Sequence, residues 1–458
     1  MPAAAPGAAP PPRHDARAGT ANPGHPGAAG RFVNPRYFLA VVGTAGDLHP
    51  FLSLGTALRR LGRPVTVITH AHHRAAVARA GLVHAASDTE ADWDRILARP
   101  GIWHPTRSFE ALLEAPTYED GLERVLGHLE AVPADPASPR VLLSHPVAVP
   151  AGAIARARGH AEHLAAVWLA PSNLKTCHGP LQLGPLPMPA WLPPSWRRAL
   201  WNWAEARYVD PVLLPQMNAV RGRRGLPPLP SWTAHMTTAP EVSLTLFPEW
   251  FGPVRPDWPR PLLAGEFPLF DPAAGDPLPA AVETFLAAGP APVVFLPGSA
   301  NLHAADFFGH ALAASARLGV RALLLTPEPG QVPQPLPPWA LWQPYVALAR
   351  LLPHAAALVH HGGIGTTAEA LRAGVPQVVT PFAWDQFDNG ARVEALGAGR
   401  VCAARWLGFG RLARCLGAVL GAAAMRQRCA QLARHFPPPR DMDALVRALE
   451  RELGLAAA

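Results

Sequence analysis

The sequence predicts an α/β protein made of two βαβ domains, whose parallel sheets face a central cleft. In both halves of the chain short apolar strands alternate with helical stretches, and this rhythm is typical of a parallel sheet covered by helices. A proline-rich segment separates the two halves. At 458 residues the chain is also too long for one compact core and long enough for two domains.

The first βαβ unit begins at Tyr37. An apolar strand, YFLAVV, is followed by the glycine-rich turn GTAGD, a helical stretch from Leu48 to Leu61, and a second strand, PVTVIT. Three more buried strands are expected at VLLSH, LAAVWLAP and VSLTLF. We therefore assign residues 34–248 to an N-terminal domain.

Residues 249–280 are interpreted as an interdomain linker, because proline at this density interrupts helices and the middle of sheets. The rhythm resumes in a C-terminal domain at 281–458, with strands PVVFLPGS, RALLLTP, AALVHHGG and PQVVTPF, and helices expected from Thr366 and from Gln386. The last helix is expected to pack back on the N-terminal domain. Two such domains leave a cleft at the carboxyl ends of both sheets, where ligands bind.

Composition limits the kinds of partner. Residues 1–33 are rich in Ala, Pro and Gly without an apolar core, so we expect a disordered tail and not a signal peptide. The net charge is +7, but the arginines are scattered, so no nucleic-acid partner is expected. No apolar run approaches the roughly 18 residues of a membrane helix. Four cysteines without C-x-x-C spacing fit a reducing cytoplasm.

The stretch HHGGIGTTAEA, at 360–370, joins a predicted strand to a predicted helix. Glycine at 362, 363 and 365 lets the backbone approach a ligand closely. The amides of Thr366 and Thr367 would lie at the positive end of the helix, where a diphosphate is favoured. The alternative is an ordinary glycine-rich turn with threonine caps, which GGIG by itself does not exclude. No G-x-G-x-x-G motif is present here, which disfavours a nicotinamide cofactor.

Side chains around this turn could supply further contacts to a nucleotide sugar. His361 can donate to the diphosphate, and Glu369, one turn into the helix, can accept from ribose hydroxyls. The next strand delivers Asp385 and Gln386 in PFAWDQFDN, and both side chains suit vicinal sugar hydroxyls. The sequence therefore predicts half of a nucleotide-sugar site.

The whole stretch HHGGIGTTAEALRAGVPQVVTPFAWDQFDN resembles the nucleotide-sugar signature of the GT-B glycosyltransferases, in the UDP-glycosyltransferase-like family. The resemblance implies a GT-B fold of two Rossmann-like domains, with the nucleotide sugar as co-substrate, no cofactor and no metal. The resemblance assigns Glu369 to the donor ribose, and Asp385 and Gln386 to the donor sugar. The residues that it assigns to the donor diphosphate are His361, Gly362, Gly363, Gly365, Thr366 and Thr367.

Two further donor contacts follow from the same resemblance. In FLPGSAN, Gly298 and Ser299 are similar to the second phosphate loop of the family. Trp342 and Tyr345, in WQPYVALARLLPH, fall where the family places its nucleobase wall. The alternative for the aromatic pair is plain packing.

The segment GTAGDLHPFLSLGTALRRLG resembles the first loop and helix of the family, where a short G-[H/D]-x-x-P motif supplies the general base of an inverting transfer. Asp47 holds that position, with Pro50 three residues on. It can take the proton of the acceptor hydroxyl if partial burial raises its pKa. The alternative is a helix N-cap. His49 is the second candidate base.

Three histidines in THAHHR, His70, His72 and His73, raise the possibility of a metal site. They have no acidic companion at ligand spacing, and the helix amides would stabilise the leaving diphosphate without a metal. We therefore expect no metal site here.

Other segments resemble the rhamnosyltransferases of bacterial rhamnolipid synthesis. This resemblance implies dTDP-L-rhamnose as donor, a hydroxyalkanoyloxy-alkanoic acid as acceptor and mono-rhamnolipid as product. It also implies a cytoplasmic protein that touches the inner membrane transiently, or meets the enzyme that makes its acceptor. The segments are RPGIWHPTRSFEALL, LWNWAEARYVDPVLLPQMNAVRGRRGL and TLFPEWFGPVRPDWPRPLLAGEFPLFD.

Acceptor residues are expected in a tryptophan-rich stretch. Trp191, Trp196 and Trp201 lie beside Arg197 and Arg198, and such a mixture suits an acyl chain with a carboxylate, or a membrane interface. The alternative is packing within a mobile lid. For the activity, the alternatives are a UDP-sugar transferase for a sterol, polyketide or other aglycone, a sugar-nucleotide epimerase or hydrolase, and a non-catalytic binding protein.

Overall fold

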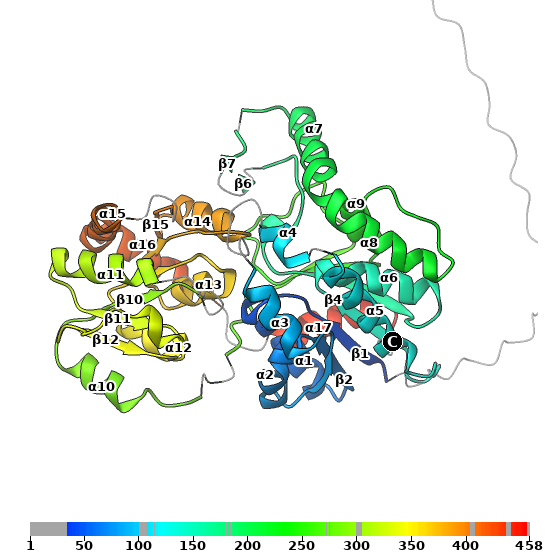
Figure 1. Ribbon diagram of the computed structural model, residues 1–458, viewed down its shortest axis with the longest axis horizontal. Coiled ribbons are helices and arrows are strands. Elements are labelled where there is room, and N and C mark those ends of the chain that lie inside the picture. The colour runs from blue at the N-terminus through cyan, green and yellow to red at the C-terminus, as the bar shows by residue number, and fades with distance from the viewer. Residues whose placement is uncertain are drawn as a thin grey trace, which may run out of the picture.

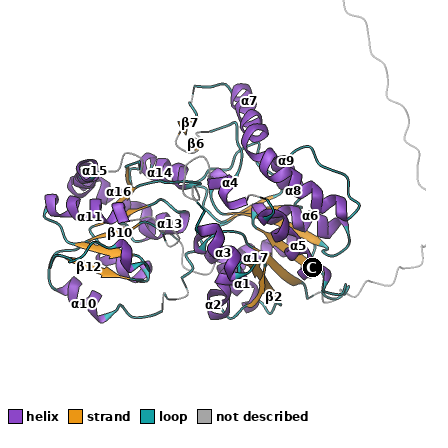
Figure 2. Ribbon diagram, viewed as in Figure 1, coloured by secondary structure: helices purple, strands orange, loops and turns teal. Residues whose placement is uncertain are grey.

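The protein was analysed as a computed structural model, which describes residues 34–99, 108–113, 115–179, 182–183, 186–189, 191–271, 273, 275–298, 305–403, 408–436 and 441–455. These residues form two lobes, each built around one sheet with helices on both faces (Figures 1 and 2). The predicted α/β fold with two parallel sheets is confirmed. No helix in the described part of the chain is long and apolar enough to cross a membrane.

The N-terminal sheet has seven parallel strands in the order β3-β2-β1-β4-β5-β8-β9. Their bounds are β1 Arg36–Ala40, β2 Val65–Thr69, β3 Val83–Ala86, β4 Arg140–Ser144, β5 His163–Trp168, β8 Val242–Thr245 and β9 Leu262–Ala264. The central strands are buried on both faces, which explains their continuous apolar sequences. Because β1 and β4 are neighbours in register, the loops that follow them leave the sheet side by side.

Within the described residues of this half, nine helices cover the sheet or extend from it. They are α1 Ala45–Arg60, α2 Arg74–Arg79, α3 Glu90–Leu97, α4 Ser108–Leu113, α5 Thr117–Glu130, α6 Val149–Ala157, α7 Pro194–Ala204, α8 Asp210–Arg223 and α9 Trp232–Thr238. A π-helical turn, Glu205–Val209, joins α7 to α8, and a short hairpin of β6 Gln182–Leu183 and β7 Leu186–Pro187 precedes α7. Short 3-10 turns lie at Ala71–His73, Pro146–Ala148 and Pro171–Asn173.

The C-terminal sheet has six parallel strands in the order β12-β11-β10-β13-β14-β15. The strands are β10 Val293–Leu296, β11 Ala322–Leu325, β12 Ala340–Gln343, β13 Ala357–His360, β14 Gln377–Val379 and β15 Gly399–Val401. The helices are α10 Ala280–Ala287, α11 Ala305–Leu318, α12 Leu348–Leu351, α13 Ile364–Arg372, α14 Gln386–Ala395, α15 Phe409–Gly421 and α16 Ala423–Ala433, with 3-10 turns at Pro329–Gln331 and Leu352–His354. The loops after β10, β13 and β14 therefore meet at one edge.

The last helix, α17 (Asp441–Glu452), packs against α1 of the N-terminal domain. Val446 and Leu449 are buried in the same hydrophobic cluster as Tyr37 of β1. Glu450 is held by Arg63 through an ion pair of 2.8 Å and accepts a hydrogen bond from the Tyr37 hydroxyl at 3.2 Å. The C-terminal segment thus ties the two halves of the chain together.

One boundary differs from the sequence-based expectation. The segment 249–280, interpreted as a linker, contributes β9 to the N-terminal sheet, paired in parallel with β8. A short strand flanked by proline is tolerated there because β9 lies at the edge of the sheet. The predicted tail at 1–33 and Ser299 both lie outside the described residues.

Candidate active site

The N-terminus of α13 forms the centre of the predicted donor site. The helix begins at Ile364, two residues before the predicted start, with Gly363 as its N-cap. The amide of Thr367 donates to the Gly363 carbonyl at 2.9 Å, so the assignment of this amide to a diphosphate is wrong. By helix geometry the amides that remain without an intrahelical acceptor are those of Ile364, Gly365 and Thr366. The positive end of the helix therefore presents a cluster of free N–H groups. These belong to residues 364–366, whereas the prediction named the amides of Thr366 and Thr367.

His361 lies between two glycines at this helix start. A Cβ added at Gly298, whose φ is +105°, would lie 3.3 Å from the His361 ring, and one at Gly363 would lie 2.5 Å from its Nε2. The ring hydrogen-bonds the backbone of Leu296, while its Nδ1 is buried without a partner among the described residues. Burial lowers the pKa of His361 to about 4, so the ring is neutral at pH 7. The neighbouring His360 has a structural role, because its Nδ1 accepts from the Gly362 amide.

Three buried polar atoms near the start of α13 have no hydrogen-bond partner in the described part of the chain. They are Nδ1 of His361, Oγ1 of Thr367 and Oδ1 of Asn389. The Asn389 amide nitrogen donates to the Gly362 carbonyl at 3.0 Å, which fixes it to the same loop. An unsatisfied buried polar atom costs about 1 to 3 kcal/mol, and such atoms call for an explanation. A ligand that donates to Asn389 Oδ1 and forms hydrogen bonds with His361 Nδ1 and the Thr367 hydroxyl would satisfy all three.

Glu369 is mostly buried on α13. Its Oε2 accepts from Arg372 at 2.7 Å. Burial raises the pKa of Glu369, Arg372 opposes that rise, and the charge of Asp271 adds to it. The carboxylate is therefore oriented by Arg372.

The two aromatic residues predicted to form a nucleobase wall lie in different environments. Trp342 donates its indole N–H to the Thr326 carbonyl at 3.0 Å and packs against the core of the C-terminal domain. Tyr345 is exposed, and its hydroxyl donates to Asp271 Oδ1 at 2.6 Å. Since Asp271 also acts on Glu369, Tyr345 is the one of the pair that lies near the predicted ribose position.

Asp385 follows a strained residue. Trp384 has φ of +59°, an uncommon conformation for a bulky side chain and one found more often at functional sites. The Asp385 carboxylate accepts from Asn389 at 2.7 Å. Burial, and then the negative charge of Asp47 from the other domain, raise the pKa of Asp385 to about 7. The two predicted motifs are therefore close enough for their carboxylates to interact.

Gln386 is buried and holds the loop before it. Its Oε1 accepts from the amides of Phe382 at 2.8 Å and Ala383 at 3.1 Å. The side-chain carbonyl is thus already in use, and only the amide nitrogen of Gln386 remains for a sugar hydroxyl.

Asp47 is not the N-cap of α1, which is Thr44, but it takes part in capping and keeps one carboxylate oxygen accessible. Its Oδ2 accepts from the Thr44 amide at 2.7 Å, which completes a capping box at the start of α1. Its Oδ1 lies 3.9 Å from Nε2 of His145, and the side chain is 35% exposed, so this oxygen remains accessible. His49, the second candidate base, packs its ring against Phe270 at 6.3 Å, and burial lowers its pKa.

His145 is the residue of this site that the sequence analysis missed. It directly follows β4, and its amide donates to the Ala40 carbonyl of β1 at 2.8 Å. Its ring is buried, Nδ1 has no partner among the described residues, and burial lowers its pKa while Asp47 opposes the change. The available signal was a histidine at the end of the predicted strand VLLSH. Only the pairing of β4 with β1 places it beside Asp47.

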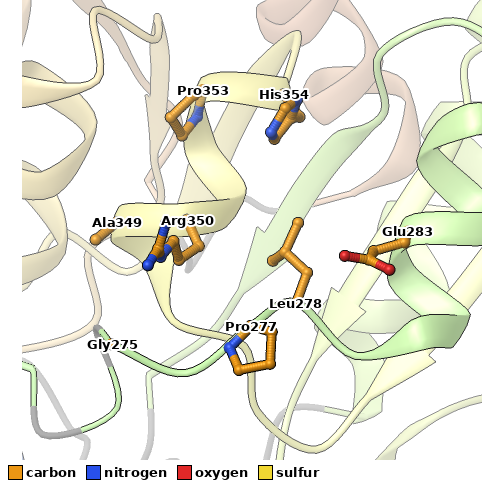
Figure 3. A pocket seen from close by; sticks show the side chains of 8 residues that line it. All are labelled: Gly275, Pro277, Leu278, Glu283, Ala349, Arg350, Pro353 and His354. Atoms are coloured by element: carbon orange, nitrogen blue, oxygen red, sulfur yellow. The ribbon is translucent and has the colours of Figure 1, made fainter.

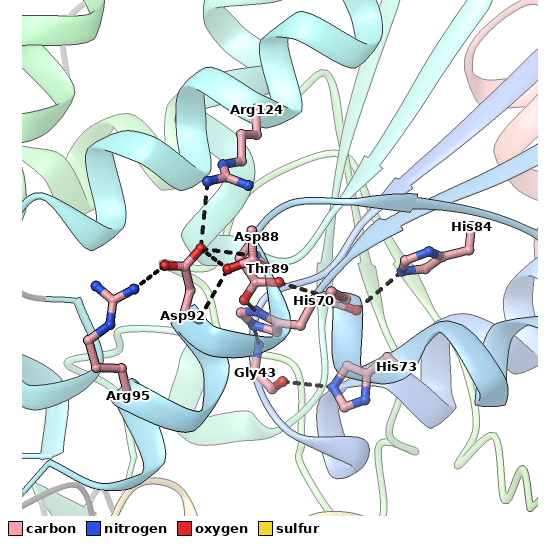
Figure 4. A network of polar contacts seen from close by, with 10 residues as sticks. Gly43, His70, His73, His84, Asp88, Thr89, Asp92, Arg95 and Arg124 are labelled. Carbon is pink, nitrogen blue, oxygen red and sulfur yellow. Dashed lines mark hydrogen bonds and ion pairs between the residues drawn. The ribbon is translucent and has the colours of Figure 1, made fainter.

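Two histidines of THAHHR hold the loop that carries Asp47 (Figure 4). The Gly43 amide donates to Nε2 of His70 at 3.1 Å, and the Gly43 carbonyl lies 3.1 Å from Nε2 of His73. Because an amide can only donate, Nε2 of His70 carries no proton, and its Nδ1 donates to Asp88 Oδ2 at 2.6 Å. The Gly43 peptide is therefore fixed on both sides. We call this arrangement of His70, His73 and Asp88 the Gly43 clamp.

The third histidine, His72, stacks on Trp93 with ring centroids 5.8 Å apart. No group of three or more His, Cys, Asp or Glu arranged to hold a metal ion occurs among the residues that the structure describes. The hydrogen bonds of the Gly43 clamp give His70 and His73 a structural explanation.

An apolar cavity of about 120 Å³ lies in the N-terminal domain. Its lining combines aliphatic side chains, including Val42, Leu113 and Val147, with polar and charged ones, and His70 and Asp88 of the Gly43 clamp lie at its wall. The cavity therefore adjoins the loop of Asp47. A larger and shallower hollow of about 510 Å³ lies on the C-terminal domain (Figure 3). None of the predicted site residues lines it.

The predicted acceptor tryptophans do not line the apolar cavity. Trp191 and Trp196 are 80% and 68% exposed on and before α7. Trp201 turns toward the body of the domain, and its indole N–H donates to the Thr176 carbonyl at 3.2 Å. The expectation that these three residues grip an acceptor together is not met by this structure.

Comparison with known proteins places the protein in a family. Residues 331–444 match the C-terminal domain of erythromycin biosynthesis protein CIII-like proteins. O-mycaminosyltylonolide 6-deoxyallosyltransferase of Streptomyces fradiae is 31% identical over 375 residues, which cover 79% of this chain and 84% of that protein. A sterol 3-beta-glucosyltransferase of Aspergillus fumigatus is 59% identical, but over only 49 residues, or 11% of this chain and 4% of that protein.

Among solved structures, spinosyn rhamnosyltransferase SpnG complexed with thymidine diphosphate superposes with a TM-score of 0.60. The match covers 91% of this chain and 100% of that one at 23% identity, which supports a shared fold. These matches confirm the GT-B fold and the glycosyltransferase activity, and they give no support to the finer resemblance to rhamnolipid enzymes. The protein belongs to the erythromycin CIII-like family of GT-B glycosyltransferases of natural-product synthesis.

Proposed function

We propose that this enzyme transfers a deoxy sugar from a thymidine diphosphate sugar to a hydroxyl of a polyketide-type or similar hydrophobic aglycone, with inversion and without a metal. The observation that carries the proposal is the set of unpartnered buried atoms in the described residues around the start of α13. Asp385, which follows the next strand, interacts with the charge of Asp47. The nucleotide follows the relative that holds thymidine diphosphate, and the deoxy sugar follows the deoxyallosyltransferase of Streptomyces fradiae.

The donor would bind along α13 and α14. Its diphosphate accepts from the free amides of Ile364, Gly365 and Thr366 and from the Thr367 hydroxyl. The negative charge of the diphosphate would favour a proton on His361 Nδ1, so that this ring then donates as well. The positive end of the helix dipole adds to this attraction. In the same pose Glu369 accepts from the ribose hydroxyls, and Asp385 and Asn389 meet the hydroxyls of the transferred sugar.

The chemistry would take place between the two domains. Asp47 accepts the proton of the acceptor hydroxyl while that oxygen attacks the anomeric carbon from the face opposite the nucleotide. The bond between the anomeric carbon and the β-phosphate oxygen breaks in the same step. Its electron pair leaves with the diphosphate, which the α13 amides stabilise.

The acceptor would lie against the apolar cavity beside Asp47. The cavity combines aliphatic and charged side chains, and its volume of about 120 Å³ is below the roughly 300 to 1,000 Å³ of ligand pockets, so only part of a hydrophobic aglycone would enter it. The lipid acceptor inferred from the rhamnolipid resemblance is less well supported, because its tryptophan residues lie elsewhere.

The experiment that tests this function is mass spectrometry of products from a matrix of donors and acceptors. The donors are dTDP-L-rhamnose, dTDP-6-deoxyglucose and UDP-glucose. The acceptors are a macrolide aglycone, an anthracycline aglycone, a sterol and a hydroxyalkanoyloxy-alkanoic acid. We expect a glycosylated polyketide with a dTDP sugar. A product formed only with the sterol, only with the lipid, or only from UDP-glucose would contradict the proposal.

The Gly43 clamp predicts that two substitutions of His70 differ in their effect on catalysis. His70→Asn keeps a donor near Nδ1 for Asp88 but removes the acceptor of the Gly43 amide. His70→Gln places an oxygen near Nε2, so it keeps that acceptor and loses the Asp88 bond. Since small displacements of catalytic groups are costly, we expect kcat to fall about ten-fold in the Asn variant and about three-fold at most in the Gln variant. Steady-state kinetics with an unchanged donor KM would support this, and equal losses in both variants would contradict it.

A further inference from the structure

Large hydrophobic side chains gather on one exposed part of the N-terminal domain. Nine such side chains are exposed in the described part of the chain, and five of them lie between residues 191 and 208. They are Trp191, Trp196, Leu200, Trp203 and Tyr208, which we call the α7 face. Exposed apolar groups are ordinary when scattered, but a contiguous group marks an interaction site.

The α7 face is displayed by a firmly anchored helix. Trp196, Leu200 and Trp203 follow an i, i+4, i+7 spacing, so they lie on one side of α7. The other side is fixed to the domain, where the Arg197 guanidinium donates to the Gly179 carbonyl at 2.8 Å and Trp201 donates to Thr176. In Figure 1 α7, in green, stands out from the rest of the molecule.

The exposed charge between residues 191 and 208 is entirely positive. Arg198 and Arg207 are exposed, and neither has an ion-pair partner among the residues that the structure describes. Arg207 lies 5.3 Å from the ring centroid of Tyr208, so this cation is part of the aromatic surface. The single acidic residue between 191 and 208, Glu205, is buried and held by Lys175 at 2.8 Å. The surface is therefore complementary to a negative one.

We propose that the α7 face docks on an anionic lipid bilayer. Tryptophan and tyrosine rings combine an apolar body with one polar group and favour the boundary between headgroups and acyl chains. Each arginine near an anionic leaflet strengthens binding about five-fold. The α7 face combines both features. It exposes Trp and Leu side chains on a short amphipathic helix, and no acidic residue among those described neutralises the cations beside it. The inference does not depend on the sugar donor or the aglycone, because none of these residues belongs to the proposed active site.

Vesicle flotation tests the proposal with the full-length protein. We expect binding to vesicles of phosphatidylcholine mixed with phosphatidylglycerol, weaker binding to phosphatidylcholine alone, and loss of binding at high salt. Trp196→Ser combined with Trp203→Ser should reduce binding about ten-fold or more. Arg198→Ser combined with Arg207→Ser should reduce it about twenty-fold on the mixed vesicles only.

Matched controls lie on the C-terminal domain. Phe409→Ser removes an equally exposed ring, and Arg317→Ser removes an exposed cation, so both variants should bind as the wild type does. An unchanged thermal midpoint in each variant would exclude unfolding as the cause. The proposal is overturned if the wild type ignores mixed vesicles, or if the Trp196→Ser/Trp203→Ser variant still binds them. It is also overturned if light scattering shows a dimer that only this variant loses, which would assign the α7 face to a second copy of the protein.

Discussion

Asp47→Asn is expected to lower kcat about a thousand-fold, within the range of general base catalysis, and to leave the dissociation constant of the donor within about two-fold. Asparagine can still accept from the Thr44 amide through its side-chain oxygen, so the capping box and the start of α1 should persist. It cannot take a proton from the acceptor. Because donor contacts are proposed on the other domain, single-turnover kinetics and calorimetry with dTDP should separate the two effects.

His361→Ala is the matched variant for the donor side. It removes the ring whose Nδ1 is buried beside α13 without a partner among the described residues, and should weaken dTDP binding about ten-fold through the loss of one charge-assisted hydrogen bond. The acceptor-side base remains intact. If Asp47→Asn weakened dTDP binding as much as His361→Ala does, the assignment of Asp47 as the base would fail. If Asp47→Asn retained full kcat, His145 or His49 would have to supply the base.

The fold was predictable because its strands are buried on both faces. Strands such as β1 and β10 therefore appear as apolar runs, and each is followed by a helix in the next stretch of sequence. β9 was missed because three residues in a proline-rich segment carry no pattern, and only pairing with β8 makes them a strand. Local sequence specifies elements, whereas the edges of a sheet depend on which strands meet.

The grouping of the proposed donor residues was predictable for a related reason. His361, Glu369 and Asp385 follow strand ends within one continuous stretch of sequence, so spacing alone brings them to one edge. The catalytic side is different, because His145 lies about a hundred residues from Asp47 and meets it only through the pairing of β1 with β4. Nor can sequence show that the Thr367 amide is already bonded. Such details depend on the exact first residue of a helix.

The clustered histidines illustrate a further limit of sequence patterns. His70 and His73 raised the possibility of a metal site, although none was expected, and the Nε2 atoms of both rings are directed at one peptide group, that of Gly43. Asp88, which orients His70, lies 18 positions further on. A sequence pattern shows which donors are close together, whereas the fold determines what they bind.

Asp385→Asn is expected to stabilise the fold at pH 8 while it impairs transfer. The pKa of Asp385 is raised from 3.8 to about 7 in the folded protein. Between these values the folded protein keeps a proton that the unfolded chain has released, so stability falls as pH rises through this window. Above pH 7 the full penalty of a buried charge beside Asp47 is present. Asparagine lacks the charge and can still accept from Asn389, so it avoids this penalty.

Denaturant unfolding at pH 8, 6 and 4 would measure this effect. Three pKa units correspond to about 4 kcal/mol, and with allowance for partial exposure we expect a gain on the order of 2 kcal/mol at pH 8 that vanishes near pH 4. Glu162→Gln is the control, because the hydrogen bonds from Arg140, 2.6 Å away, outweigh the effect of burial and lower the pKa of Glu162, so its replacement should destabilise the fold at pH 8. If Asp385→Asn were also less stable at pH 8, the buried carboxylate would be stabilising and not a strained group kept for the donor sugar. A gain in stability together with a loss of transfer is the result expected of a group retained for function.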